Sequence, residues 1–301
     1  MSGSLLVAST VDDAVEKLAA GARAVAGGTD LVVGARQGKA PLPESLVAIH
    51  RLEELRRVHE DDGESLRLGA LVTHAELAAH PLVRSRLTAL ADACAIVGSH
   101  STRAFGTIGG NLMNASPAME TGGPLLCFDS TVMLRSVSGI RALAIDELLA
   151  GPGQTTAAPD ELLEEVKVPR VPEGTGSSYV RLEYRRQMEI AVVGATAVVR
   201  IEAGQVTDAR VAITALSPTI RRVGEAEAAL LGTDGGSEAL RSAARAIAAA
   251  ARPISDVRAS ADYRSAMAAV IGRRAIEVAC GRADGEQIPV PASAVFSGGV
   301  G

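Results

Sequence analysis

A cluster of prolines and glycines divides the chain into two parts whose hydrophobic patterns differ. The cluster consists of Pro169, Pro172, Gly174 and Gly176. Because such residues end helices and strands, we expect a domain boundary there. Short helical and strand-like segments alternate before the cluster, whereas strands followed by alanine-rich helices come after it. The pattern predicts an α+β fold with one domain over residues 1–170, a second over 175–282 and a flexible tail over 283–301.

Local patterns in the first part predict helices and strands in turn. The segment "TVDDAVEKLAAG" begins with Thr10, a suitable helix N-cap, and its apolar residues share one helical face. "LRRVHE" and "SLRLGALV" alternate around "DDGE", which predicts a hairpin, and "STVMLRSVSGIRALAI" predicts two more strands. Residues 73–97 form an amphipathic segment that Pro81 splits into two helical pieces. We expect sub-parts over residues 1–55 and 56–170.

The second part has the pattern of a three-stranded antiparallel meander. "SYVRLEYR" and "AVVGATAVVRIEAGQVTDARVAIT" contain the strands, with Gly204 in one turn. Two alanine-rich helices are expected over residues 236–251 and 260–280. Aromatic residues make up only 2% of the chain, so its core has to be built from Ala, Val, Leu and Ile.

Charge and composition argue against several classes of protein. The net charge of −5 and the pI of about 5.6 argue against a nucleic-acid partner, which would need a basic face. No apolar run approaches the roughly 20 residues of a transmembrane helix, and the N-terminus lacks the features of a secretory signal. Cys94, Cys127 and Cys280 form no zinc or iron–sulfur pattern. We therefore expect reduced thiols in a cytoplasmic protein.

The segment "AVAGGTDLVVGAR" is a candidate phosphate-binding loop. Gly27 and Gly28 follow a strand pattern, and a helix-like segment resumes after Thr29 and Asp30. Paired glycines let the backbone approach a ligand closely, and N–H groups at such a turn favour a phosphate. Neither a G-x-G-x-x-G fingerprint nor a P-loop is present. A tight strand-to-helix turn capped by Thr29 is the equally weighted alternative.

A second candidate loop, "RAFGTIGGNLMNASPAMETGG", covers residues 103–123. Adjacent glycines and nearby asparagines do not suit an ordinary helix, so we expect a loop in which Gly109 and Gly110 expose backbone N–H groups. Hydroxyls, amides and one carboxylate add polar contacts; these are Thr107, Asn111, Asn114, Ser116 and Glu120. Two glycine-rich loops facing each other would clamp a diphosphate. A polar surface loop is the alternative.

Other kinds of site lack support in the sequence. The histidines never pair at i, i+4, and neither H-E-x-x-H nor G-x-S-x-G occurs. His74, near a predicted helix start, is expected to cap or pack rather than bind a ligand. The two glycine-rich segments therefore point to a bound nucleotide cofactor.

At these two segments the chain resembles the FAD-binding medium subunits of molybdenum hydroxylases, the family of carbon monoxide and xanthine dehydrogenases. The family's first loop is "AGGTDL" here, and its second is "TIGGNLMNASP". Weaker similarities, such as "LRLGALVTHAEL" and "YRRQMEIAVVGA", follow in the family's order over residues 5–280. The resemblance implies a two-part FAD-binding domain of the vanillyl-alcohol-oxidase (PCMH) type. A C-terminal domain with a three-stranded antiparallel sheet and helices would follow.

The resemblance also implies which residues bind the cofactor. Both glycine-rich segments would wrap the FAD pyrophosphate, and Leu163 and Arg181 would lie near the flavin ring. The full set expected at FAD is Ala26, Gly27, Gly28, Thr29, Asp30, Leu31, Thr107, Ile108, Gly109, Gly110, Asn111, Asn114, Ser116, Glu120, Leu163 and Arg181.

The chain departs from the family's pattern in three places. Glu120 stands where relatives have Asp, and "SLLVAST" replaces an aromatic N-terminal motif. Ile190 stands where an aromatic residue often covers the flavin. These departures put the flavin's contacts in question and leave two further hypotheses open. One is a non-catalytic assembly or binding subunit with weakened or lost FAD binding, and the other is a self-contained flavin oxidase.

The role that the resemblance implies is electron transfer within a complex. A large subunit would carry the molybdenum cofactor and oxidise the substrate, and a small subunit would carry two 2Fe–2S clusters. Electrons would pass from these clusters through FAD to NAD, a quinone or another acceptor. A dimer of heterotrimers is the expected assembly.

Overall fold

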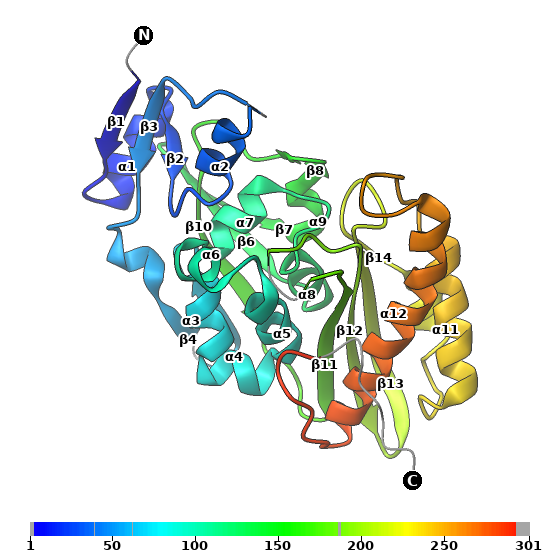
Figure 1. The fold of residues 1–301 in the computed structure, drawn as a ribbon. Coiled ribbons are helices and arrows are strands. Elements are labelled where there is room, and N and C mark those ends of the chain that lie inside the picture. Colours follow the sequence, from blue (N-terminus) through cyan, green and yellow to red (C-terminus); the bar gives the residue numbers. More distant parts are fainter. Residues whose placement is uncertain (1–2, 39, 62, 186–187, 293–301) are drawn as a thin grey trace. The chain divides into compact units, whose positions relative to one another are not determined.

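The computed structural model describes residues 3–38, 40–61, 63–185 and 188–292. The chain forms two compact units, and each unit takes three stretches of sequence (Figure 1). Unit 1 comprises Met1–Glu76, His100–Ala115 and Asp129–Arg170. Unit 2 comprises Leu77–Ser99, Ser116–Phe128 and Val171–Gly301. Unit 2 therefore includes two segments that precede residue 170.

Unit 1 begins with a parallel sheet of three short strands. The strands are β1 (Ser4–Val7), β3 (Ser45–Ala48) and β2 (Arg23–Val25), in that order across the sheet. Parallel neighbours need crossover connections, which contain α1 (Val11–Ala19) and α2 (Leu31–Arg36). The predicted cap is confirmed, since the Thr10 hydroxyl accepts a hydrogen bond from the Asp13 N–H at 3.1 Å.

The larger sheet of unit 1 has five antiparallel strands in the order β4-β5-β10-β6-β7. They are β4 (Val58–Asp61), β5 (Ser65–Gly69), β10 (Leu162–Pro169), β6 (Thr131–Ser136) and β7 (Gly139–Ala144). Both predicted hairpins are confirmed, as β4 pairs with β5 and β6 with β7. Smaller elements of this unit are η1 (Glu53–Arg56), α9 (Ile145–Leu148), β8 (Leu149–Gly151) and β9 (Gln154–Thr155).

The amphipathic segment at residues 73–97 forms three helices, not the two expected. They are α3 (His74–Ala79), α4 (Pro81–Arg86) and α5 (Thr88–Ile96). The additional break lies at Leu87, whose backbone is not helical. Tertiary contacts fix this break, because the Thr88 hydroxyl donates to the Ser177 carbonyl at 2.8 Å and the Ala89 N–H donates to the Ser177 hydroxyl at 3.0 Å.

The sheet of unit 2 has four antiparallel strands, one more than predicted. Three long strands form the expected meander, and they are β11 (Thr175–Leu182), β12 (Val193–Glu202) and β13 (Gln205–Thr214). The fourth, β14 (Arg221–Arg222), pairs with β13 through two residues. It was too short to leave a hydrophobic pattern in the sequence.

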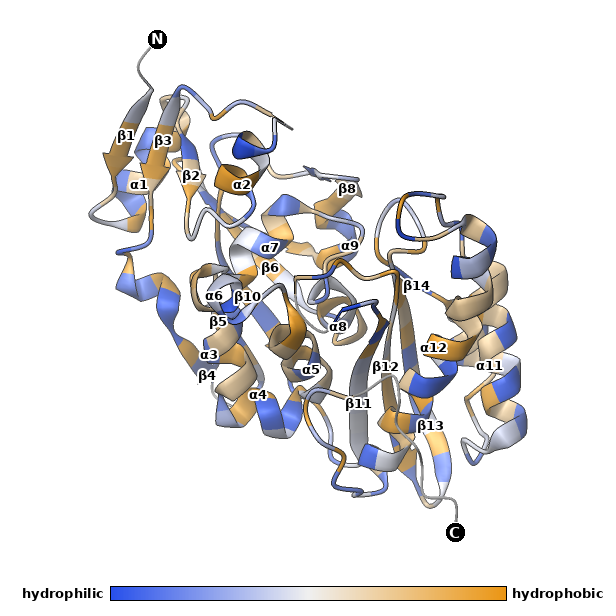
Figure 2. Ribbon diagram, viewed as in Figure 1, coloured by the Kyte–Doolittle hydropathy of each residue, from blue (hydrophilic) through white to orange (hydrophobic). Residues whose placement is uncertain are grey.

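Two alanine-rich helices cover one face of this sheet, as predicted. They are α11 (Ser237–Ala250) and α12 (Ala261–Ala283), preceded by the short α10 (Gly224–Ala228). Both helices carry apolar and polar residues side by side, as expected for helices with one buried face (Figure 2). The unit also contains α8 (Gly122–Cys127), which packs on β12 and β13.

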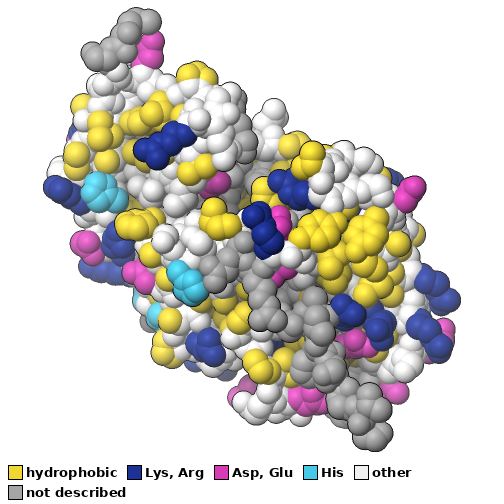
Figure 3. All heavy atoms as spheres, viewed as in Figure 1, with side chains coloured by type: hydrophobic (Ala, Val, Ile, Leu, Met, Phe, Trp, Pro, Cys, Tyr) yellow, Lys and Arg dark blue, Asp and Glu magenta, His cyan; other side chains and the backbone are white. Residues whose placement is uncertain are grey.

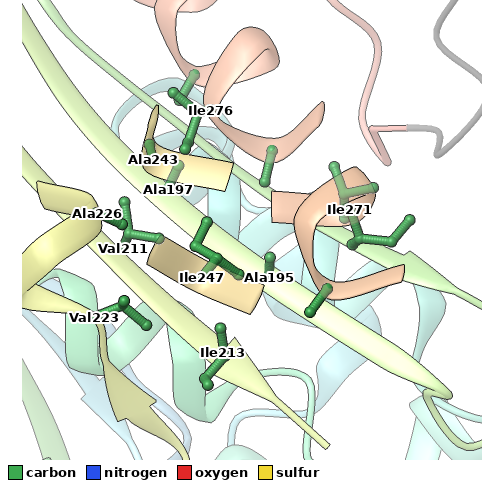
Figure 4. Close-up of a cluster of buried hydrophobic side chains, with 14 of the residues drawn as sticks. Ala195, Ala197, Val211, Ile213, Val223, Ala226, Ala243, Ile247, Ile271 and Ile276 are labelled. Carbon is green, nitrogen blue, oxygen red and sulfur yellow. The ribbon is translucent and has the colours of Figure 1, made fainter. Parts of the chain in front are cut away.

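The core between the sheet and these helices consists of aliphatic side chains. Ile247 of α11 and Ile271 and Ile276 of α12 belong to one buried cluster with strand residues such as Val211 and Ile213 (Figure 4). The two helices come close at Gly272, where a Cβ atom would lie 2.4 Å from the Ile247 Cδ1. Small residues such as Gly272 let the helices approach closely, so aliphatic side chains fill the core without aromatic ones.

The C-terminal segment up to residue 292 is held against unit 2. Asp92 accepts a hydrogen bond from the Ala292 N–H at 2.9 Å, and the Arg282 guanidinium donates to the Pro289 carbonyl at 2.9 Å. The rest of the tail that was expected to be flexible, residues 293–301, lies outside the described residues.

Candidate functional site

The predicted cofactor-binding residues lie in both units. Unit 1 contains Ala26 to Leu31, Thr107 to Asn111, Asn114 and Leu163. Unit 2 contains Ser116, Glu120 and Arg181. Two local arrangements result: glycine-rich segments that meet in unit 1, and a buried ion pair in unit 2.

The first segment is a tight turn between β2 and α2 in which both glycines are needed. Gly28 has a φ of +67°, a left-handed conformation that other residues adopt only with strain. At Gly27 a Cβ atom would lie 1.9 Å from the Phe105 carbonyl oxygen, so no side chain fits. The pair therefore allows the turn and its close approach to a second backbone segment.

The N–H groups of this turn are available to a ligand. In the described part of the chain, the backbone N–H groups of Gly27, Gly28 and Thr29 have no hydrogen-bond acceptor. These residues are exposed or half-buried. Consecutive N–H groups at a turn form an anion-binding concavity, which suits a phosphate or diphosphate.

The second glycine-rich segment is not the loop that the sequence predicted. Residues Ile108–Asn114 form helix α7, preceded by α6 (His100–Phe105). Thr107 is the N-cap of α7, and its hydroxyl accepts from the Gly110 N–H at 3.0 Å. A good N-cap and tertiary packing outweigh the poor helix propensity of two glycines and an asparagine.

The expectation that Gly109 and Gly110 expose their N–H groups is also wrong. The Gly109 N–H donates to the Ala70 carbonyl at 2.9 Å, and the Gly110 N–H donates to the Thr107 hydroxyl. The adjacent N–H groups of Ile108 and Asn111 donate to the Val72 and Thr107 carbonyls. At the start of α7 these N–H groups therefore already have acceptors within the protein. Backbone N–H contacts to an anion have to come from the turn between β2 and α2, at Gly27, Gly28 and Thr29.

Gly109 has a packing role instead. A Cβ atom at this position would lie 2.7 Å from the Ala70 Cβ and 2.8 Å from the Ala70 carbonyl oxygen. The glycine thus lets α7 rest directly on the backbone that follows β5. Gly110, by contrast, is exposed, and a Cβ there would meet only the Thr107 hydroxyl, at 3.1 Å.

The two glycine-rich segments meet in unit 1, as the clamp hypothesis requires. Gly27 contacts the Phe105 backbone, and a Cβ atom on the next residue, Gly106, would lie 3.4 Å from the Thr29 hydroxyl. The Gly106 carbonyl accepts from the His74 N–H at 3.0 Å, and an isolated bridge pairs Thr73 with Thr107. The available N–H groups of the first turn therefore lie beside the start of α7.

His74 packs beneath this junction. Its side chain is buried, and burial together with the charge of Arg103 lowers its pKa to about 4. The ring is therefore neutral at physiological pH, which agrees with the expected packing role.

The other predicted residues of unit 1 differ in exposure. Asn114 is exposed at the end of α7, and Asn111 is half-buried. Leu163 is 3% exposed in β10 and lies opposite Leu134 of β6, so its side chain is buried on one face of the sheet.

In unit 2, Glu120 and Arg181 form a buried ion pair. The Arg181 Nη1 lies 2.5 Å from the Glu120 Oε1, and its Nε donates to Glu183 at 2.6 Å. Burial raises the pKa of Glu120 to about 7, although Arg181 opposes this shift. One guanidinium therefore faces two carboxylates, and the Glu120 carboxylate already has a partner within the protein.

Ser116 is the remaining predicted position in this unit, and Ile190 is one of the positions where the sequence departs from the family's pattern. The Ser116 hydroxyl accepts from the Ala118 N–H at 3.2 Å within a turn. The Ile190 side chain is 45% exposed.

Phe105 and Gly106 are parts of the junction that the sequence pattern did not predict. Phe105 is 65% exposed, although large apolar side chains such as phenylalanine are mostly buried in folded proteins. Both residues lie just before Thr107, the N-cap of α7. Their position beside the second glycine-rich segment was the one feature of the sequence that could have indicated a role in the junction.

The described residues show no cluster of His, Cys, Asp and Glu arranged to hold a metal ion. None of the described helices is both long and apolar enough to cross a bilayer. On the face seen in Figure 3, basic and acidic side chains are interspersed.

Comparison with known families identifies two matching regions. Residues 1–171 match the family described as "FAD binding domain in molybdopterin dehydrogenase". Residues 178–279 match the "CO dehydrogenase flavoprotein C-terminal domain".

Individual relatives match along most of the chain. The carbon monoxide dehydrogenase medium chain of Hydrogenophaga pseudoflava is 32% identical over 80% of this chain and 83% of its own. The xanthine dehydrogenase FAD-binding subunit of Escherichia coli O157:H7 is 28% identical over 93% of this chain and 96% of its own. A solved structure of carbon monoxide dehydrogenase from H. pseudoflava superposes with a TM-score of 0.89 and 32% identity, covering 94% of this chain and 98% of that one.

Proposed function

The chain belongs to the family of FAD-binding medium subunits of molybdenum hydroxylases, and we propose that it is the flavin-carrying electron-transfer subunit of such a complex. It is accordingly an oxidoreductase subunit, like its relatives. Bound FAD would add redox chemistry that takes up electrons singly and releases them in pairs. The chain's own residues bind the cofactor and set its surroundings.

The observation that carries this proposal is the set of N–H groups at Gly27, Gly28 and Thr29. They have no acceptor in the described part of the chain and lie beside the start of α7. We assign them to the FAD pyrophosphate, because a concavity of backbone N–H groups binds an anion without needing a nearby lysine or arginine. The Thr107, Asn111 and Asn114 side chains are assigned to the same cofactor.

The second glycine pair is assigned a different role from the first. Gly109 sets the position of α7 on Ala70, and Gly110 keeps an exposed surface free of a side chain. In unit 2, Glu120 and Arg181 form one buried pair, and their place in the proposed set rests on the resemblance. Ser116 and Leu163 stay in the proposed set on the resemblance alone.

The proposed complex divides its chemistry among subunits. The chain lacks an iron–sulfur ligand pattern, so we place two 2Fe–2S clusters on a small partner subunit and the molybdenum cofactor on a large one. The acceptor is NAD, a quinone or another carrier. A dimer of heterotrimers in the cytoplasm is the assembly that we propose.

A second candidate is an assembly subunit that keeps the fold and has lost FAD. The observation that favours it is Glu120, whose carboxylate is paired with Arg181 and therefore less available to a cofactor. The two candidates differ in one measurable property, which is the FAD content of the purified protein.

The first experiment measures this content. We expect the chain, purified and reconstituted with FAD, to show the two visible absorption bands of a bound oxidised flavin at about one FAD per chain. A complex that contains both partner subunits but no flavin would instead establish the assembly role.

The second experiment tests the first glycine turn with a matched pair of variants. Gly28→Ala and Gly38→Ala both place alanine at a left-handed position, with φ of +67° and +71°. The backbone strain is similar, at roughly 1 kcal/mol, but only Gly28 lies in the proposed site. A Cβ atom at Gly28 would also lie 3.1 Å from the Val32 Cγ2, whereas one at Gly38 would meet nothing within 4 Å, so the stability of both variants is measured as well. Titration with FAD should show weaker binding for Gly28→Ala alone, and equal affinities would remove this turn from the site.

A further inference from the structure

The sheet of unit 2 has two faces with different chemistry. One face carries the aliphatic core under α11 and α12 (Figure 4). Strand register places Tyr179 opposite Thr196, and Gly194 opposite both Arg181 and Thr214, on the other face. Helix α8 packs on β12 and β13, with Gly123 directly against the two threonines of this polar face.

Three hydroxyl groups on the polar face are fully buried. The Tyr179, Thr196 and Thr214 side chains are each 0% exposed. Their oxygen atoms have no hydrogen-bond partner among residues 3–38, 40–61, 63–185 and 188–292. Leaving a buried hydroxyl unsatisfied destabilises a protein by roughly 1–3 kcal/mol, so three of them together call for an explanation.

Each of the three hydroxyls lies against one of two glycines, and Thr214 lies near both glycines. A Cβ atom at Gly123 would lie 2.5 Å from the Thr196 hydroxyl and 3.3 Å from the Thr214 hydroxyl. A Cβ atom at Gly194 would lie 2.7 Å from the Tyr179 hydroxyl and 3.1 Å from the Thr214 Cβ. Both glycines therefore leave out a side chain at the point where the hydroxyl groups gather.

We propose that Tyr179, Thr196 and Thr214 form an internal binding site for an ordered water molecule next to the Glu120–Arg181 pair. A buried water makes about three hydrogen bonds, mostly to polar groups that would otherwise be unsatisfied. Hydroxyls can each donate or accept, so three of them can satisfy one water.

One residue of the neighbouring ion pair shares strand β11 with the hydroxyl cluster. Arg181 lies two residues after Tyr179 on the same strand face, opposite Gly194. The charges of Glu120 and Arg181 both act on Tyr179, whose pKa is raised chiefly by burial. The proposed water therefore lies in the same buried region of unit 2 as the Glu120–Arg181 pair.

Valine variants test the site, because Thr→Val removes a hydroxyl with little change in shape. In a hydrated cluster the water loses a partner, so the urea midpoints of Thr196→Val and Thr214→Val should fall. In a dry cluster the same changes remove an unsatisfied group, so the midpoints would rise. The two opposite signs separate the alternatives.

A matched control and a coupling measurement complete the test. Thr88→Val removes a hydroxyl that already donates to the Ser177 carbonyl at 2.8 Å, so it calibrates the loss of a satisfied hydroxyl. The Thr196→Val/Thr214→Val double variant should lose less than the two single variants combined, because both act on one water. Strictly additive losses would contradict a shared water.

A direct measurement does not depend on any variant. A crystal structure of the full-length protein, at a resolution that shows ordered solvent, should contain a density peak within hydrogen-bond distance of the three hydroxyls. Tyr179→Phe should weaken or displace this peak. A cluster without density, or midpoints that rise in the valine variants, would overturn the proposal.

Discussion

At the scale of single residues, Asp92 connects three segments of unit 2. Its carboxylate accepts from Arg282 at 2.6 Å and 3.0 Å, from the Tyr179 N–H at 3.1 Å and from the Ala292 N–H at 2.9 Å. Burial raises its pKa, and Arg282 opposes the shift. These hydrogen bonds offset the cost of burying the Asp92 carboxylate. Removing its negative charge would leave the buried Arg282 guanidinium without a compensating charge.

Asp92→Asn is therefore expected to lower the free energy of unfolding by about 3–5 kcal/mol. Equilibrium urea unfolding measures the change. Glu238→Gln, which breaks an exposed pair with Arg241 whose side chains are 74% and 66% exposed, is the control and should change stability by less than about 1 kcal/mol. Similar losses of unfolding free energy in the two variants would show that the buried pair contributes no more to stability than the exposed one.

Glu120 should make the stability of the protein depend on pH near neutrality. Its pKa rises from 4.5 to about 7 on folding, chiefly because of burial. Between these two pKa values the folded state holds a proton that the unfolded state has released. The stabilisation that comes from binding this proton is fully present below the unfolded-state pKa of 4.5, and it is lost as the pH rises through the folded-state pKa of about 7. Glu120→Gln should flatten the curve of urea midpoint against pH in this window. An unchanged slope would assign the titration to another group.

At the scale of elements, sequence patterns predicted those whose signals are local. Thr10, Pro81 and the "DDGE" turn lie next to the residues they organise, and the elements around them formed as expected. Helix α7 was missed because its stability depends on contacts distant in sequence, above all the packing of Gly109 on Ala70. The break at Leu87 was missed for the same reason, since Ser177 fixes the start of α5.

The candidate site shows the same limit. The sequence indicated the glycine pairs and their nucleotide chemistry, and the structure brings the two segments together. Which N–H groups are available could not be predicted, because it depends on where the Ala70 and Val72 carbonyls lie. The pairing of Glu120 with Arg181 joins positions that are far apart in the sequence, and a single sequence has no signal for it.

Two alanine variants of α7 should shift stability in opposite directions. Gly110 is an exposed helical position, so Gly110→Ala should raise the free energy of unfolding by roughly 0.5–1 kcal/mol. Gly109→Ala forces a methyl group against Ala70 and should lower it by about 1–3 kcal/mol. Urea unfolding of the protein without FAD measures both. If Gly109→Ala leaves the stability unchanged or raises it, the tight packing of Gly109 on Ala70 is not important.

At the scale of the whole molecule, the two units do not correspond to two consecutive halves of the chain. Helices α5 and α8 precede residue 170 yet belong to unit 2. Six consecutive residues of α5, from Ala89 to Cys94, are buried, and its carboxylate Asp92 pairs with Arg282. The family match to residues 1–171 therefore covers all of unit 1 and also two segments of unit 2.

This interleaving predicts that residues 1–170 will not fold when produced alone. The fragment keeps α5 and α8 but lacks β11 to α12, so their apolar surfaces and Asp92 lose the partners that bury them. We expect no cooperative urea transition, binding of a hydrophobic dye and no retained FAD. Residues 1–292, which keep every described element, are the control and should unfold cooperatively. A fragment 1–170 with a cooperative transition and native FAD affinity would show that the flavin-binding unit does not need the elements from β11 to α12 that bury α5 and α8.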